Sequence, residues 1–577
     1  MLKDCLEIFA KKYEEYGEAY ILDNYILADG TYLLINKEGE IEKRLDISKK
    51  NGELDRTDNT YTMFSQLDYY SKLIDMNKPI DSKKIIHSNN YLSFFVKKDN
   101  ITSGKLTEDI INKYYEILLN PLIKYKNKSR EIYERALEEY GEVSKDNLIK
   151  NREWILKNIF QVCEKHNINQ DKNYLKIFFK ENIQVWEKES NKYLLPNIYN
   201  STDYNTFING EIYGMPNDNI GLNSKKPYLK QKGRKNEIPY LISTKEVLLQ
   251  KKFFDYLMNE ASQGKLNIYI DDYIKCFKNN EKNKKIGYSF NGYFLRIQKG
   301  MEVEIKDFDE ICNYNEDIKG CCINRSIDIN YAKLKYETKM QYGNINTLNE
   351  LSSVINSILF SSKLSSSYYK EKDKLEIKDN VLKQSVLQSR EAFFDWFYKG
   401  NEQRIKTIFP KLSIRIIKNT ICNGHRIKAQ EQWMLREGVI NYLYKGGYKM
   451  PDTMKEVLNE IDKKINDKEQ PIIESDIEYA LAVGQLVNYL ISLSKSNFSS
   501  HAAINPILNT KSDIQLKEHI KKLFKKYNYA IDRNSRRFRN LYAMIEGYKT
   551  EKEISEDALL YGYLTNCLIY KKEGEGK

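Results

Sequence analysis

Apolar residues recur every three or four positions over most of this chain, and this spacing predicts a fold dominated by helices. Glycine and proline fall at the breaks between the helical stretches, as Gly141 and Pro121 do. Helices are expected over residues 4–16, 106–119, 129–140, 145–166, 174–193 and 246–258, and almost continuously from about residue 347.

Shorter β-rich runs interrupt this pattern in the first 345 residues. Two runs, 20–27 and 31–36, flank the dipeptide Asp29-Gly30, which is typical of a β-hairpin turn. A further strand is expected over 91–98, and a second hairpin over 286–305 around Lys299-Gly300. The predicted fold class is α+β and predominantly α, with a mixed α/β N-terminal region that carries β-hairpins and a C-terminal helical bundle.

The same patterns suggest how the chain divides. Residues 1–345 are expected to form a mixed α/β domain, 346–450 a helical region that ends in a Gly-rich linker, and 451–577 a helical bundle. In that bundle Ser475 and Glu478 form a predicted capping box that starts a helix through Lys495, and Ser555 is expected to cap a last helix through Tyr570. Four or five helices in about 120 residues suit a bundle.

Composition narrows the class of protein. The 577 residues include 93 Lys and Arg against 81 Asp and Glu, a formal charge of +12. Only 17 of the basic residues are Arg, and AT-rich coding explains part of the Lys excess, so the distribution of charge matters more than its sum. Apolar runs are too short to cross a membrane, and no signal peptide is expected. Eight Cys are too few for a disulfide scaffold, so a reducing cytoplasm is predicted.

Sequence motifs for catalysis are missing. The chain contains no P-loop, dinucleotide-binding, H-E-x-x-H or G-x-S-x-G motif. The adjacent Asp271 and Asp272 would point to opposite sides of a strand and are interpreted as a solvated turn. Zinc at Cys312, Cys321, Cys322 and Cys276 is disfavoured by the C-x₈-C-C spacing, so free thiols are expected. We predict no catalytic residue, no metal and no cofactor.

Residues 196–240 form an irregular stretch with four of the ten Pro, and such stretches are usually functional or disordered. Lys and Arg neutralise phosphate, and Asn and Ser can bond base edges, so the segment is a candidate DNA motif-reading loop. A solvated surface loop is the alternative. The candidate residues are Asn217, Asn219, Asn223, Ser224, Lys225, Lys226, Lys230, Lys232, Arg234 and Lys235.

A second basic segment spans residues 510–549, where eleven basic and four acidic residues sum to +7. At helical spacing Ile520, Leu523, Phe524 and Tyr527 share one face, and the next helix repeats this with Phe538, Leu541, Tyr542 and Ile545. Basic residues on the opposite faces are predicted to contact a DNA backbone. A solvated face or a membrane-surface helix remains an alternative. The predicted contacts are Lys521, Lys522, Lys525, Lys526, Arg533, Arg536, Arg537 and Arg539.

Several stretches resemble a known family. The opening LKDCLEIF and ILDNYILADGTYLLIN, the loop GMPNDNIGLNSKKPYL and the hairpin FNGYFLRIQKGMEVEIKDFDEI are similar to the large subunit of subtype I-B CRISPR interference (Cascade) complexes. The tail segments YALAVGQLVNYLISLSKS, KKLFKKYNYAI and RFRNLYAMIEGY carry the same likeness, which runs over nearly the full chain.

The resemblance implies a cytoplasmic, non-enzymatic subunit of an RNA-guided complex. Such a subunit holds the 5′ end of the guide RNA, recognises the protospacer-adjacent motif in duplex DNA and helps to open the strands, while a separate helicase-nuclease is recruited to cut. Its implied partners are the guide CRISPR RNA, the target duplex and displaced strand, and the backbone and guide-end subunits.

The resemblance also implies that the C-terminal bundle can be made separately, as a small subunit, from an internal start at Met450 or Met454. Two other functions stay open from the residues alone. One is a nuclease whose carboxylates are dispersed in sequence, and the other is a scaffold that bridges proteins without touching DNA.

Overall fold

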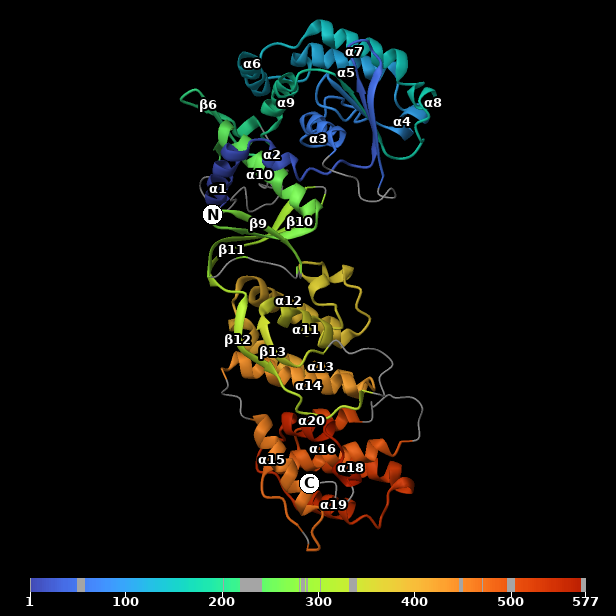
Figure 1. Cartoon of the computed structure of the whole chain (residues 1–577), viewed down its shortest axis with the longest axis vertical. Coiled ribbons are helices and arrows are strands. Elements are labelled where there is room, and N and C mark those ends of the chain that lie inside the picture. Colours follow the sequence, from blue (N-terminus) through green and yellow to red (C-terminus); the bar gives the residue numbers. More distant parts are fainter. Residues whose placement is uncertain are drawn as a thin grey trace. The chain divides into compact units, whose positions relative to one another are not determined.

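The computed structural model describes residues 2–48, 58–200, 202–217, 241–279, 281, 286, 289–300, 302–331, 340–445, 450–469, 471–494 and 504–571. They form two compact units, which Figure 1 draws with their elements labelled. Unit 1 comprises residues 1–279 and 292–310, and unit 2 comprises 280–291 and 311–577. Helices make up most of the regular structure, which confirms the α+β, predominantly α class. The expected boundaries near 345 and 450 stay predictions.

Unit 1 is built on a four-stranded sheet with the order β2-β1-β4-β3. Strand β1 (Gly30–Ile35) lies parallel to β4 (Tyr174–Phe179) and antiparallel to β2 (Ile41–Ile47), and β3 (Ser93–Lys97) is antiparallel to β4. The central strands are buried almost throughout because helices cover both of their faces, and the buried Lys176 of β4 pairs with Asp68 at 2.5 Å.

Neighbouring aromatic residues of β4 contact different helices. Phe178 packs against Phe64 of α3 (Asn59–Ser71) and Trp186 of α9 (Ile183–Asn197). Phe179 packs edge-on against Trp154 of α7 (Lys145–Asn158), next to α5 (Glu108–Leu119) in Figure 1. Because successive strand residues point to opposite faces, α3 and α9 cover one face of the sheet and α7 covers the other.

Two sequence-based expectations for this sheet are wrong. Residues 20–27 do not form a strand: α2 (Ala19–Leu22) packs on α10 (Thr244–Ser262), and β1 pairs instead with β2. Residues 174–193 are not one helix, because the run 174–179 is taken into the sheet as β4 before α9 begins. The expected strands at 31–36 and 91–98 are confirmed as β1 and β3.

The other predicted helices of the N-terminal region are confirmed with small changes in their ends. The run 145–166 divides into α7 and a short α8 (Val162–Lys165). The remaining helices here are α1 (Leu2–Tyr16), α4 (Lys98–Thr102), α6 (Lys128–Tyr140) and α10 (Thr244–Ser262).

A second sheet has the order β11-β10-β8-β9. The predicted hairpin at Lys299-Gly300 is confirmed, since β10 (Phe290–Lys299) and β11 (Val303–Tyr314) flank it. Strands β8 (Lys265–Ile270) and β9 (Ile274–Lys278) enclose Asp271 and Asp272, which form the expected turn. Asp271 accepts a hydrogen bond from the Tyr273 amide at 2.8 Å and pairs with Lys275.

Unit 2 contains β12 (Asp317–Ile323) and β13 (Gly343–Thr347), which form an antiparallel pair and precede a run of helices. Thr347 and Glu350 form a capping box at the start of the first of them. The helices before the linker are α11 (Leu348–Ile358), α12 (Asn380–Lys399), α13 (Gln403–Cys422) and α14 (Arg426–Leu443).

The C-terminal bundle is packed around α16 (Asp476–Ser492), nearly all of which is buried. It crosses α20 (Glu556–Leu564) where Gly484 and Gly562 face the opposite backbone; a Cβ on Gly484 would lie 2.4 Å from the Leu559 carbonyl oxygen. Ser475 and Ser555 cap these helices as predicted, but the helices end earlier than expected, at Ser492 and Leu564. The expected capping box is incomplete, because the Glu478 side chain accepts from the Glu474 amide and not from that of Ser475. The remaining helices are α15 (Met450–Lys464), α17 (Asn505–Asn509), α18 (Asp513–Tyr527) and α19 (Arg536–Gly547).

Helix α14 joins the helical middle of the chain to this bundle. Arg436 pairs with Asp557 at 3.0 Å, and the Gln430 amide donates to the Leu564 carbonyl at 2.6 Å. Trp433 packs on Tyr561 with ring centroids 5.8 Å apart. A product that began at Met450 or Met454 would lack α14, so these buried faces of α20 would be exposed. None of the described helices is long and apolar enough to span a membrane.

Candidate nucleic-acid interface

Helix α18 separates apolar from basic residues as the sequence predicts. Leu516, Ile520, Leu523 and Tyr527 are buried, and Phe524 is half-buried. Asp513 in the first turn and Lys525 and Lys526 in the last turn each complement the helix dipole.

Helix α19 is fixed against α18 by an aromatic cluster. The ring of Phe524 stacks on Phe538, with centroids 6.3 Å apart, and on Tyr542 at 5.2 Å. Phe538 also packs on Tyr489 of α16 at 5.3 Å. Ser535 caps α19 by accepting a hydrogen bond from the Phe538 amide. The predicted inner faces of both helices are therefore confirmed, and their outer faces are held in fixed register.

Five cations stand on the outer side of these two helices and the connection between them. No carboxylate of the described residues forms an ion pair with any of the five, and the ammonium of Lys526 lies 5.3 Å from the ring centroid of Tyr527. We call the group the α18–α19 cationic surface. It consists of the exposed residues Lys522, Lys525, Lys526, Arg533 and Arg539.

The other predicted backbone contacts are placed differently. Lys521 is exposed but pairs with Glu546 at 3.2 Å, and Arg536 is half-buried. Arg537 does not face outward as expected. Its side chain is buried, and its guanidinium pairs with Asp462 of α15 and donates to the Asn466 side chain at 2.7 Å. Arg537 lies one helical turn before the buried Leu541 and shares its face of α19, so it points toward α15 and not toward solvent.

The predicted motif-reading loop lies mostly outside the described residues, which hold none of its residues from Asn219 to Lys235. Asn217 is described and is not at the surface as expected. It is 2% exposed, its amide donates to the Ile198 carbonyl at 2.9 Å, and its side chain donates to Asn197 at the end of α9. We therefore remove Asn217 from the candidate interface.

The described residues on either side of 218–240 contribute to a small three-stranded sheet that the sequence patterns did not predict. Strand β6 (Glu211–Gly214) pairs with β5 (Thr206–Ile208) on one side and with β7 (Ile242–Ser243) on the other. The signal was present: Asn209-Gly210 is a strong hairpin dipeptide, and both residues have the positive φ that such a turn needs. Gly214 pairs with Ile242 in this sheet, so the described residues before and after 218–240 lie on neighbouring strands.

No group of three or more His, Cys, Asp or Glu side chains suited to a metal is found in the described parts of the chain. Cys312 is exposed and Cys322 is half-buried, whereas burial raises the pKa of the Cys321 thiol to about 12. All three are free thiols.

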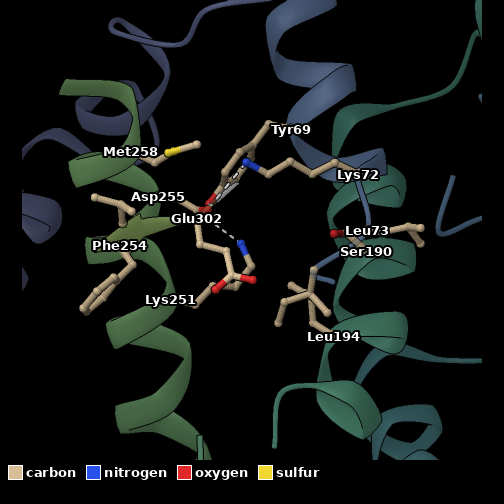
Figure 2. A pocket seen from close by; sticks show the side chains of 12 residues that line it. Tyr69, Lys72, Leu73, Ser190, Leu194, Lys251, Phe254, Asp255, Met258 and Glu302 are labelled. Carbon is tan, nitrogen blue, oxygen red and sulfur yellow. Dashed lines mark hydrogen bonds and ion pairs between the residues drawn. The ribbon is translucent and has the colours of Figure 1, made fainter. Parts of the chain in front are cut away.

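A pocket of about 240 Å³ in unit 1 contains a buried charge cluster, drawn in Figure 2. Asp255 of α10 pairs with Lys251 and with Lys72, whose ammonium is 3.5 Å away, and accepts a hydrogen bond from Tyr69 at 3.1 Å. Burial alone would raise the pKa of the Asp255 carboxyl, but Lys251 and Lys72 hold it below its usual value. Because residues of α10, of α3 and directly after the end of α3 satisfy the Asp255 carboxylate, the cluster links these two helices to each other.

The chain matches none of the family models, curated proteins or solved structures with which it was compared.

Proposed function

We propose that the chain is a non-catalytic, nucleic-acid-binding subunit of an RNA-guided effector complex of the type I-B class. In this role it binds the target duplex beside the guide, recognises a short motif there, holds the 5′ end of the guide RNA and aids strand opening. Its partners would be the other complex subunits and a recruited helicase-nuclease.

The α18–α19 cationic surface is the observation that carries this proposal. Its five cations have no acidic partner among the described residues, and the helices that present them are locked by the Phe524, Phe538 and Tyr542 cluster. An unpaired, preorganised set of cations suits a phosphate backbone, because binding then releases counterions without breaking internal ion pairs.

The loop supports motif recognition as a separate step. Six basic residues and no acid lie between residues 219 and 236, and the strands that precede and follow this segment, β6 and β7, pair with each other. In the proposal this loop reads the motif, and the α18–α19 cationic surface contacts the backbone and carries no sequence information.

The test replaces Lys522 and Lys525 with Ala in the full chain and measures binding of a DNA duplex over a series of salt concentrations. Each phosphate contact contributes about 0.9 to the slope of log affinity against log salt, so the double variant should lower that slope by up to about 2. Matched and scrambled motifs should lose affinity equally, because only backbone contacts are removed.

A matched control removes the same charge elsewhere on the bundle. Lys455 and Lys463 of α15 are exposed, and the K455A/K463A variant has the same net charge as K522A/K525A. Equal weakening by both double variants would show that net charge alone drives binding, and the proposed interface would be rejected. No weakening by K522A/K525A would reject it as well.

A further inference from the structure

Unit 1 contains a second pocket, of about 150 Å³, at the carboxyl ends of β1 and β4. Ile35 and Phe179, the last residues of these two strands, lie in its wall. The strands are parallel neighbours, and α/β proteins commonly bind ligands where parallel strands end. The volume is below the range of about 300–1,000 Å³ typical of small-molecule sites, so this pocket suits a single ring system.

An indole forms one side of this pocket. Trp154 of α7 is half-buried, and its ring nitrogen donates to the Gly39 carbonyl at 2.7 Å. Gly39 has a φ of 87° in the turn between β1 and β2, and a Cβ there would lie 3.3 Å from the indole. The turn and the edge-on contact with Phe179 therefore hold the ring in place.

Lysines, amides and one carboxylate, that of Glu181, complete the lining; the Glu181 carboxylate accepts a hydrogen bond from the Asn182 amide at 3.1 Å. Lys37 and Lys150 are exposed, and neither has an acidic partner among the described residues; the Lys150 ammonium donates to the Lys37 carbonyl. Lys180 also lines the pocket, but Glu42 pairs with it at 2.7 Å. Asn147 and Asn151 add two amide groups, of which Asn151 is buried and donates to the Tyr91 carbonyl.

We infer that this pocket binds one nucleotide of a single-stranded nucleic acid. Its base stacks on Trp154, its base edge meets the amides of Asn147 and Asn151, and its phosphate lies between Lys37 and Lys150. A half-exposed indole is a stacking surface for any base, and two ammonium groups without an acidic partner among the described residues supply the charge for one phosphate. The site lies in unit 1 and does not depend on the α18–α19 cationic surface.

The distribution of tryptophan makes this inference measurable. The chain has four Trp, and Trp186, Trp396 and Trp433 are fully buried. A base stacked on Trp154 should therefore quench the solvent-exposed part of the emission. The probes are a uridine hexamer of RNA, a thymidine hexamer of DNA and uridine monophosphate, each titrated into the full chain. We expect saturable quenching by a hexamer and much weaker binding of the monophosphate.

Three variants test the assignment by fluorescence anisotropy of a labelled hexamer. W154A should weaken binding about 5- to 150-fold, as loss of one stacked base does, and W154F should retain most of the affinity. K37A/K150A removes the phosphate contact and should weaken binding about tenfold. Because both lysines are exposed, this variant should fold normally even if W154A does not. Lys105 is exposed and outside the pocket, so K105A should bind as wild type does.

The inference is overturned if neither hexamer quenches, or if K37A/K150A and K105A bind equally well. If uridine monophosphate binds with the same affinity as the hexamers, the pocket is a site for free nucleotides and not for a nucleic-acid strand. The result is separable from the proposed function. If K37A/K150A loses hexamer binding but keeps the salt slope of duplex binding, the loss is assigned to this pocket alone. K522A/K525A should do the reverse: it should change the salt slope of duplex binding and leave the tryptophan quenching by the hexamer unchanged.

Discussion

Replacing Arg537 with Ala should destabilise unit 2 without removing a DNA contact. The sequence places Arg537 among four arginines on a basic helix, but the structure buries its side chain to 10% exposure against Asp462, which is itself 18% exposed. The truncation would leave the Asp462 carboxylate and the Asn466 side chain without their main partner on α19.

The size of the effect follows from these contacts. Breaking a buried ion pair by removing one partner costs about 3–5 kcal/mol. Here Lys571 stays 2.7 Å from Asp462 and keeps that carboxylate partly neutralised, so we expect a loss of about 2–3 kcal/mol in the free energy of unfolding. At roughly 2–4 °C per kcal/mol for a unit of this size, the melting temperature should fall by about 4–12 °C.

The matched control is Arg539→Ala, two residues further along the same helix. Arg539 is exposed and has no acidic partner among the described residues, so its loss should change stability by less than about 0.5 kcal/mol. Differential scanning calorimetry measures both variants, and a DNA shift at fixed salt measures binding. R539A should weaken binding at full stability, and R537A should bind normally while it remains folded.

The opposite pattern would contradict this reasoning. If R537A melts at the wild-type temperature and binds DNA as weakly as R539A, then Arg537 is available to solvent and the ion pair with Asp462 does not hold in solution. A parallel D462N variant checks the same pair from the other side and should also lower the melting temperature.

Two further predictions concern packing and charge inside the units. Gly484→Ala should cost about 1–3 kcal/mol in unfolding free energy, because its Cβ would meet the backbone of α20, whereas Gly547→Ala meets no atom within 4 Å and should be neutral or slightly stabilising; chemical denaturation measures both. Asp255→Asn should flatten the acid dependence of stability. The folded pKa of Asp255 is lowered, so its contribution is present above the unfolded pKa of about 3.9 and is lost as pH falls through the folded pKa; equal slopes for wild type and D255N below pH 5 would contradict this.

The sequence predicts local features of this protein well. Helix α18 has its apolar and basic residues on the expected sides, and the hairpin at Lys299-Gly300 forms where the dipeptide indicates. The sequence does not identify β4, because a short and mostly apolar run suits a buried strand as well as a helix, and only its pairing with β1 and β3 decides between them.

The candidate sites show the same limit. The pocket beside Trp154 combines residues from the β1–β2 turn, from α7 and from the end of β4, and no spacing in the sequence connects positions 37, 154 and 180. Asn217 is of a residue type that can read bases, but it is buried beside α9. It follows β6 closely in the chain, and its side chain donates to the Asn197 carbonyl.

The order of residues alone determined which side chains of α18 can meet solvent, because a helix repeats every 3.6 residues whatever surrounds it. It also determined that positive charge gathers at 219–236 and 510–549. Only the tertiary structure decided which of those charges are available. Arg537 is neutralised by an aspartate 75 positions earlier, and Arg539 is left in solvent, because ion pairing depends on distance in space and not on distance along the chain.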